Sequence, residues 1–309
     1  MGFDMRDNSV DNAFFNFSFP QQETQGYSLV VDSPHSGRDY PSDFNYTCDF
    51  SQLRRLEDAY VDLFCEGLDE LGASVLTSKI PRSYIDTSRA RDCLDPAYIP
   101  GGLSELPFDA TGNNERSLKA QTGLIFLQSK INNFRIYDTG HEPNEQAIKT
   151  RLNAWDAYHT KLSSVFNAAH DEQKTVYHID LHSCWRLGAK DKAGERMRRP
   201  DVIIHDKFGR SCTSDFTQTV LSVFKDEGFD AQLNVAPFKG GYIVTNYGRP
   251  ENNLNSIQIE FVRDLYMNES TLELHEGVKR IQDTMKKLTQ SVIEFANLKH
   301  NIAPEEYAL

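Results

Sequence analysis

Short apolar runs that end at turn-forming residues recur along the chain, and they predict the strands of a sheet. These runs cover residues 28–34, 73–80, 175–181, 201–205 and 257–262. Several are apolar at consecutive positions rather than at every second one, which is typical of strands that are buried on both faces. Buried strands of this kind belong to sheets that are covered by helices.

Longer segments between these runs carry apolar residues at helical spacing. They predict helices over residues 53–71, 142–169, 214–227 and 271–298. Because strands and helices alternate over the whole length, we expect an α/β fold in which a mixed sheet is flanked by helices. No repeat or linker divides the chain, so residues 1–309 are expected to form a single domain. Residues 92–121, rich in Pro, Gly and Asn, have the length of an active-site loop.

The composition excludes some classes of function. The chain has 45 acidic and 33 basic residues and a net charge of −12, which argues against nucleic acid or an anionic membrane as the main partner. No stretch approaches the roughly 20 apolar residues of a membrane span, and the N-terminus lacks the layout of a signal peptide. The 5 cysteines are scattered, with no C-x-x-C pair, and are predicted to be free thiols in a reducing cytoplasm.

Two histidines occupy similar places in two similar phrases, His35 in VDSPHSG (31–37) and His182 in HIDLHSC (178–184). Each follows or ends a predicted strand, which is where open α/β sheets carry their chemistry. A single histidine in such a place is more often structural than a metal ligand. Two at equivalent strand ends favour a metal site, because catalytic zinc usually has three protein ligands and one open position.

A third ligand is expected from the acidic segment LEDAYVD (56–62), which lies in a predicted helix. Asp58 and Asp62 are four residues apart and would share one helix face, so that one could bind metal while the other orients it. For Glu57 we expect a solvated helix face. The spacing alone leaves a purely structural role for the whole segment about equally open.

Arginines cluster in IPRSYIDTSRAR (80–91), in an otherwise acidic protein. Arg82 and Arg89 lie beside apolar residues, and a planar guanidinium grips a carboxylate at two points. For these two residues, binding of a carboxylate ligand and formation of surface salt bridges are about equally open interpretations. For Arg91 we expect the surface salt bridge.

Two later segments add further candidates. In NSIQIEFVRDLYM (255–267), strand alternation places Glu260 on the face opposite Ile259 and Phe261. A buried glutamate needs a partner, and a carboxylate beside a metal site is a general base for amide hydrolysis. In FKGGYIVTNYGRP (238–250), Gly240 and Gly241 are typical of a turn, and Gly241 could also let the backbone approach a ligand, with Tyr242 and Arg249 near it as candidate substrate contacts.

Taken in order, these phrases resemble the N-formylglutamate amidohydrolase family, which is related to the zinc carboxypeptidases and aspartoacylases. The resemblance runs from about residue 27 to 268, leaving 269–309 as a C-terminal helix and tail. It rests on PHSG, the D-x-x-x-D segment, R-x-x-x-D-x-x-R, DLHS, FGRSC, FKGGYI and QIEF-x-x-x-LYM. The resemblance implies a phosphorylase/hydrolase-like α/β fold, as in the zinc carboxypeptidases, and a cytoplasmic enzyme of histidine degradation.

The same resemblance implies the site. One Zn²⁺ would be held by His35, Asp58 and His182, with Asp62 and Asp180 orienting these ligands. Glu260 would be the general base and proton shuttle, and Arg82 would assist at the oxyanion. Arg89 would grip the substrate carboxylate, aided by the contacts named above (Arg82, Gly241, Tyr242, Arg249). Ser88 stands where relatives carry Asn, and Thr245 and Asn246 stand where a His is common.

The implied substrate is a small N-acyl acidic amino acid, N-formyl-L-glutamate, from which formate is released. Two alternatives stay open. One is an aspartoacylase-like or carboxypeptidase-like hydrolase of other N-acyl amino acids or short peptides. The other is a metal-free protein that binds acidic ligands. Ser36 and Ser183 are expected to be loop hydrogen-bonding residues rather than nucleophiles, because neither lies in G-x-S-x-G.

Overall fold

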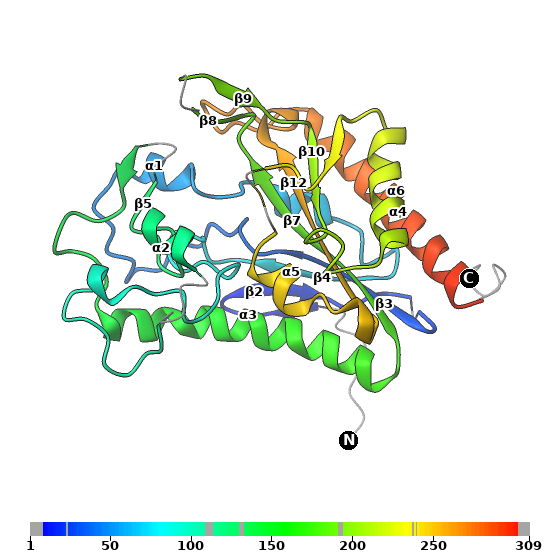
Figure 1. The fold of residues 1–309 in the computed structure, drawn as a ribbon, viewed down its shortest axis with the longest axis horizontal. Helices are drawn as coiled ribbons and strands as arrows, with labels where there is room; N and C mark the ends of the chain where they lie inside the picture. Colours follow the sequence, from blue (N-terminus) through cyan, green and yellow to red (C-terminus); the bar gives the residue numbers. More distant parts are fainter. Residues whose placement is uncertain are drawn as a thin grey trace.

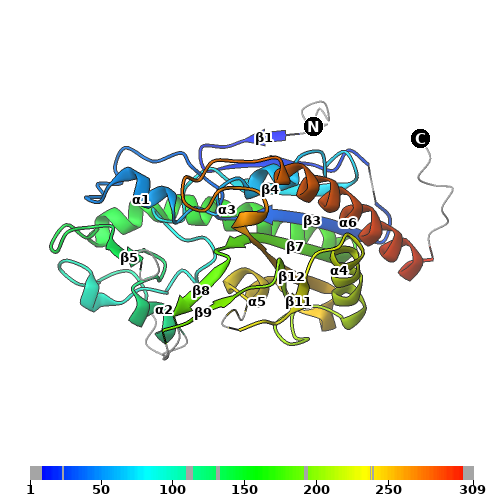
Figure 2. The same ribbon diagram turned by 90° about the horizontal axis from the view of Figure 1, so that it is seen from above.

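The computed structural model describes residues 9–22, 24–108, 114–129, 133–190, 194–236, 238 and 240–301. Its centre is an eight-stranded mixed sheet with the strand order β1-β2-β4-β3-β7-β12-β10-β11. Figures 1 and 2 show this sheet from two directions, with helices against both of its faces. The strands are β1 (Ser9–Asp11), β2 (Phe15–Ser18), β3 (Tyr27–Ser33), β4 (Ala73–Ser78), β7 (Thr175–Cys184), β10 (Val202–His205), β11 (Ala231–Leu233) and β12 (Leu254–Val262).

The middle of the sheet is parallel. β4, β3, β7 and β12 run side by side in the same direction, whereas β2 and β10 pair antiparallel at either side of them. The carboxyl ends of the four parallel strands therefore lie at one edge of the sheet, which is where α/β sheets place their ligand sites. The predicted α/β fold with a mixed sheet flanked by helices is confirmed.

Alternate residues of β12 face different layers. Ile257, Ile259 and Phe261 belong to the main core, together with residues of α4 (Ser214–Asp226) and α6 (Gly277–Lys299). The opposite face of the sheet packs against α3 (Glu145–Asp171), through side chains such as Val30, Val176 and Phe166. Among the described residues, no helix is both long and apolar enough to cross a membrane.

A second cluster of buried side chains lies within the long connection between β3 and β7. It includes Phe44, Tyr84, Phe126 and Trp155, and the segments that contribute to it lie to the left of the sheet in both views. Apart from β4 and α3, regular structure in this connection is sparse: α1 (Phe50–Arg54), the 3₁₀ helices η1 (Val61–Cys65) and η2 (Pro96–Tyr98), α2 (Glu115–Ala120), and the small sheet of β5 (Gln128–Ser129) and β6 (Phe134–Arg135). After β7, β8 (Leu187–Lys190) and β9 (Arg196–Arg198) form another small sheet.

The helix predicted over residues 53–71 is wrong as a continuous element. α1 ends at Arg54, and the 3₁₀ helix η1 covers only Val61–Cys65. Tyr60, just before η1, has a φ of +67°, in the left-handed region that no α-helix residue adopts. The apolar residues of this segment are buried as the spacing suggested, for example Leu53, Phe64 and Leu68. They reach the core from turns rather than from one helix, and Asp58 lies in the same irregular stretch between α1 and η1.

Other boundaries differ less. The helices predicted at 142–169, 214–227 and 271–298 correspond to α3, α4 and α6. The short α5 (Tyr242–Tyr247) and the hairpin of β1 and β2 were not predicted. β7 continues to Cys184, so His182 lies within the strand rather than in the loop that follows it. Of the two glycines before α5, Gly240 has a φ of +73°, in the left-handed region that favours glycine, whereas a Cβ atom at Gly241 would meet only ordinary van der Waals contacts.

Candidate active site

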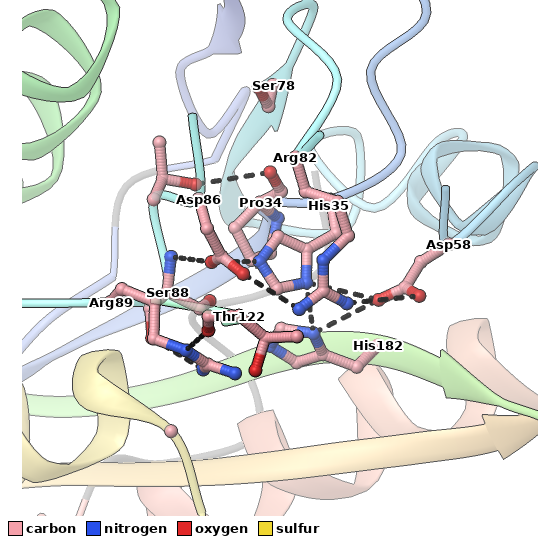
Figure 3. A network of polar contacts seen from close by, with 12 residues as sticks. Pro34, His35, Asp58, Ser78, Arg82, Asp86, Ser88, Arg89, Thr122 and His182 are labelled. Carbon is pink, nitrogen blue, oxygen red and sulfur yellow. Dashed lines mark hydrogen bonds and ion pairs between the residues drawn. The ribbon is translucent and has the colours of Figure 1, made fainter. Parts of the chain in front are cut away.

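Three side chains converge at the carboxyl edge of the parallel strands. His35 Nδ1 and His182 Nδ1 lie 3.0 Å apart, and Asp58 Oδ2 lies 3.3 Å from the first and 3.2 Å from the second. The possible ligand atoms of all three residues fall within 4.8 Å of one another, and all three side chains are buried. Figure 3 shows them pointing toward a common centre. The structure thus brings together the three residues proposed from the sequence as metal ligands.

Neighbouring strands hold the two histidines. His182 lies on β7, and His35 follows the last residue of β3 by two positions, in the strand pair that runs parallel from Tyr27–Thr175 to Asp32–Asp180. Asp58 comes from an irregular segment, and its backbone N–H donates to the carbonyl oxygen of His35 at 3.0 Å. That hydrogen bond holds Asp58 next to His35.

The outer nitrogens of both imidazoles face buried aspartates. His35 Nε2 lies 2.7 Å from Asp86 Oδ1, and His182 Nε2 lies 2.8 Å from Asp180 Oδ1. The second contact is close but poorly aligned for a hydrogen bond, and the Asp180 carboxylate has no other hydrogen-bond partner in the described part of the chain. An aspartate behind an imidazole favours the tautomer with the proton on Nε2, which leaves the Nδ1 lone pair free for a metal.

These residues fit a metal ion. Two Nδ1 lone pairs and a carboxylate oxygen that face each other at 3.0–3.3 Å repel unless a cation lies among them. Ligands bound about 2.0–2.1 Å from a tetrahedral zinc lie roughly 3.3 Å from one another, close to these separations. Imidazole and carboxylate are also the ligand types of catalytic zinc sites.

Asp58 is held in its ionised form. Burial opposes ionisation, but the contacts with His182 and His35 and the charge of Arg82 together hold the pKa of Asp58 well below its usual range. Its other oxygen, Oδ1, accepts a hydrogen bond from Arg263 at 3.1 Å and lies 3.7 Å from Arg82 Nη1. Oδ2 is therefore left to face the two imidazoles.

Glu260 lies directly beside His182. The two residues are partners in the register of β12 and β7, so their side chains leave the same face of the sheet on neighbouring strands. Glu260 is 5% exposed, and burial raises its pKa to about 7, although His182 acts in the opposite direction. A carboxylate with a pKa near neutrality is suited to exchange protons in general acid–base catalysis.

Arg82 reaches the site from the loop after β4. Its Nη2 donates to Asp86 Oδ2 at 2.8 Å, so the Asp86 carboxylate contacts both Arg82 and His35 (Figure 3). The Nε of Arg82 is buried and has no hydrogen-bond partner among the described residues. A donor of this kind is available to a developing negative charge on a substrate.

Arg89 is half-buried and oriented by carbonyl oxygens rather than by acids. Its Nε donates to Thr122 O at 3.1 Å and its Nη1 to Ser88 O at 3.3 Å. No carboxylate lies within ion-pair distance of Arg89 in the part of the chain that the structure describes. Asp86 belongs to the same turn, but its carboxylate pairs with Arg82 and His35. A guanidinium that is positioned yet unpaired can receive the carboxylate of a ligand.

The glycine segment before α5 lies close to Glu260. The Gly241 N–H donates to Gln258 Oε1 at 2.7 Å, and the Tyr242 N–H donates to Ser88 O at 3.3 Å. Gly241 and Tyr242 thereby adjoin both the Glu260 strand and the Arg89 turn. Arg249 does not: it is exposed and bonds through its backbone to Leu254, at the start of β12. Six residues of strand, roughly 20 Å, separate that position from Glu260, so the expectation that Arg249 binds substrate disagrees with the structure.

The acidic segment departs from expectation at two positions. Glu57 was expected on a solvated face, which is wrong: it is fully buried, accepts from Tyr40 Oη at 2.5 Å and pairs with Arg54 Nε at 2.9 Å. Asp62 was expected to orient Asp58 from the next helical turn, but there is no such helix, and its carboxylate pairs with Arg38 at 3.0 Å. The surface salt bridge expected for Arg91 is confirmed, with Asp156 as its partner at 2.9 Å.

Some residues of the site were not assigned their place from the sequence. Asp86, which faces His35, lies inside the R-x-x-x-D-x-x-R phrase, so its motif was a usable signal. Arg263 donates to Ser183 Oγ, to Asp58 Oδ1 and to backbone carbonyls, and Gln258 contacts Glu260. Neither has a periodicity or spacing that reveals such contacts.

The family model for N-formylglutamate amidohydrolase matches residues 27–267. The chain belongs to the N-formylglutamate amidohydrolase family. Membership of this family identifies the protein as a hydrolase that acts on an amide.

Several relatives share most of their length with this chain. The crystal structure of N-formylglutamate amidohydrolase from Ralstonia eutropha is 30% identical, with a TM-score of 0.81, and the match covers 93% of this chain and 100% of that one. The N-formylglutamate deformylases of Pseudomonas aeruginosa and Pseudomonas putida are 25% and 24% identical, over 78% of this chain and 82% of each relative.

Proposed function

We propose that this protein hydrolyses N-formyl-L-glutamate to formate and L-glutamate, with one zinc ion held by His35, Asp58 and His182. The observation that carries the proposal is the position of Glu260 beside this triad, on the strand next to His182. A metal site with an adjacent carboxylate is an arrangement that catalyses amide hydrolysis. The named activities of the relatives support the choice of substrate.

Zinc, when bound, would supply a Lewis acid that polarises a carbonyl group and lowers the pKa of water. The residues of the chain do the rest. Glu260 takes a proton from the attacking water as its oxygen adds to the formyl carbon. It then gives that proton to the departing nitrogen as the C–N bond breaks, which leaves formate and a free amine.

Two arginines have separate parts in this proposal. The unpartnered Nε of Arg82 donates to the oxygen that becomes negatively charged during the attack. Arg89 binds the substrate α-carboxylate, and its hydrogen bonds to Ser88 O and Thr122 O hold the guanidinium in place beforehand. Tyr242, whose N–H donates to Ser88 O, and its neighbour Gly241 line the same side of the substrate.

Two further parts of the proposal concern the cell. We place the enzyme in the cytoplasm, which the free thiols of its 5 cysteines support. We also assign it to histidine degradation, where N-formyl-L-glutamate would be the substrate at hand. Deletion of the gene in a strain grown on histidine, with analysis of accumulated N-formyl amino acids, tests this assignment.

Formate release from N-formyl-L-glutamate, measured with and without added zinc, tests the reaction. We expect activity that rises with zinc to one ion per chain, and none in His182→Ala. N-acetyl-L-glutamate, N-acetyl-L-aspartate and short acidic peptides should be poorer substrates. A preference for an acetylated substrate or a peptide would instead support an aspartoacylase-like or carboxypeptidase-like hydrolase. A protein that binds glutamate derivatives without metal or turnover would refute the catalytic role.

A further inference from the structure

Gln258 connects Glu260 to the backbone of the segment before α5. It lies two positions before Glu260 on β12, on the same face of the strand, and is 5% exposed. Its Oε1 accepts the Gly241 N–H at 2.7 Å, and its Nε2 donates to Glu260 Oε1 at 2.8 Å. One side-chain amide therefore joins the carboxylate at the site to a loop from another part of the chain.

The direction of these two hydrogen bonds follows from their chemistry. A backbone N–H can only donate, so the amide oxygen of Gln258 must face Gly241. The amide nitrogen must then face Glu260, where it donates to Oε1. Oε1 is thereby engaged as an acceptor, while Oε2 of Glu260 has no hydrogen-bond partner among the described residues. Oε2 is the oxygen left to take a proton.

Gly241 adjoins both neighbouring segments. A Cβ atom at this position would lie 3.4 Å from Gln258 Oε1 and 3.7 Å from Ser88 O, which is ordinary van der Waals contact, so the hydrogen bond does not depend on a glycine here. On the other side of the loop, the Tyr242 N–H bonds to Ser88 O, one residue from Arg89. The loop is thus held between the strand that carries Glu260 and the turn that carries Arg89.

We propose that Gln258 is a positioning residue for Glu260, which fixes the carboxylate so that Oε2 is the oxygen that accepts and returns the proton. The inference rests on the proposed function, in which Glu260 is the general base. Gln258 itself touches no reacting atom. Its effect is to hold Oε1 in a hydrogen bond anchored to the Gly241 backbone, so that the carboxylate cannot rotate during the two proton transfers.

Two substitutions separate the two hydrogen bonds. Gln258→Glu keeps the length of the side chain and an acceptor for the Gly241 N–H, but loses the donor to Glu260. Gln258→Met keeps an unbranched chain of similar length and loses both bonds. The glutamate variant also places a second carboxylate beside Glu260, so the uncharged methionine variant carries the comparison. If Gln258 served only to hold the loop, the methionine variant would keep the pH profile of wild type, whereas a positioning role predicts that the acid limb of that profile moves.

We expect both variants, loaded with zinc, to lose about ten- to a hundredfold in kcat with KM within about threefold of wild type, because a base displaced from its position loses that much. The acid limb of the pH profile of kcat/KM should move to higher pH, since the hydrogen bond from Gln258 favours the ionised form of Glu260. Zinc content should stay at one per chain.

Ser256→Ala is the matched control. Ser256 is buried on the same strand and face, and its Oγ bonds to His178 Nδ1 at 2.8 Å, away from Glu260. Its loss should leave kcat and the pH profile unchanged, even if the protein is less stable. A Gln258→Met variant with the kcat and pH profile of wild type would overturn the inference.

A measurement without turnover decides the same question. The carboxyl resonance of Glu260, assigned in ¹³C-glutamate-labelled protein by its absence from Glu260→Gln, should titrate at higher pH in both Gln258 variants. An unchanged titration would overturn the positioning role. If the wild-type enzyme released no formate from N-formyl-L-glutamate, the proposed function would fail, while this titration would still decide the role of Gln258.

Discussion

His35 Nδ1 and His182 Nδ1 lie 3.0 Å apart, each with its other ring nitrogen within 2.8 Å of a buried aspartate oxygen. Imidazoles in this arrangement direct lone pairs at one another, which costs free energy unless a cation lies between them. The aspartates behind them therefore contribute to metal binding without touching the metal.

Asp86→Asn tests that contribution. Asparagine keeps the size of the side chain but removes the charge that His35 Nε2 and Arg82 Nη2 share. We expect the affinity for zinc to fall about ten- to a hundredfold, as is usual when a partner of a metal-bound histidine is lost. Competition with a chelator of known affinity measures this. Asp156→Asn, which breaks the surface pair with Arg91, is the control and should leave the affinity unchanged.

Glu260→Gln tests the general base. The amide keeps the volume and polarity of the carboxylate but cannot take a proton at neutral pH, so kcat should fall about 10²–10⁴-fold. Zinc content, measured on the same preparation by atomic absorption, should stay near that of wild type. Loss of the metal in this variant would make Glu260 a ligand, and the base would have to be another residue.

Arg89→Lys tests carboxylate recognition. Lysine keeps the charge but not the planar fork, and one hydrogen bond to a charged group is worth roughly 1.5–3 kcal/mol. kcat/KM for N-formyl-L-glutamate should therefore fall about ten- to a hundredfold. The α-amide of the same substrate, which lacks that carboxylate charge, should be hydrolysed about equally by both enzymes. Arg91→Lys, two residues along and paired with Asp156, should behave like wild type on both.

A fourth prediction concerns stability and pH. Burial lowers the pKa of His159 to about 4, and its ring is bonded to Thr87 O and Tyr247 Oη. In the unfolded chain an ordinary histidine takes up a proton below about pH 6.5. The folded protein does not, so the contribution of neutral His159 is complete above that pH and is lost as the pH falls toward 4.

Denaturant unfolding of His159→Gln and wild type at several pH values measures this loss. The stability difference in favour of wild type should shrink by roughly 2 kcal/mol between pH 7 and pH 5. His170→Gln, at an exposed position on the same helix α3, should show no such change. A constant difference between wild type and His159→Gln would mean that His159 is protonated in the folded state as well.

Those parts of the site that lie on regular strands could be predicted from the sequence. β3, β7 and β12 have apolar runs that are easily recognised, and His35, His182 and Glu260 lie at or near their carboxyl ends. Alternation also placed Glu260 on the correct face, opposite the core residues Ile259 and Phe261.

The parts of the site that lie on irregular backbone could not be predicted in the same way. The spacing of Leu53, Phe64 and Leu68 is helical, yet the left-handed Tyr60 and the hydrogen bond from Asp58 N to His35 O set the conformation there. The partners of these contacts are distant in the chain, so no local pattern encodes them. Glu57 was misjudged for the same reason, since its partner Tyr40 lies in another loop.

The separation of the two imidazoles is set by the spacing of adjacent strands, about 4.8 Å, because β3 and β7 are neighbours in the sheet. The 141 residues between these strands, 34–174, begin with His35 and Asp58, continue with Arg82 and Arg89, and then contain most of the irregular structure. Insertions or deletions after Arg89, in residues 90–144, can therefore remodel what the enzyme accepts without moving His35, Asp58 or His182. Divergence of substrate preference among related enzymes is expected to accumulate there, while the hydrolytic chemistry is inherited unchanged.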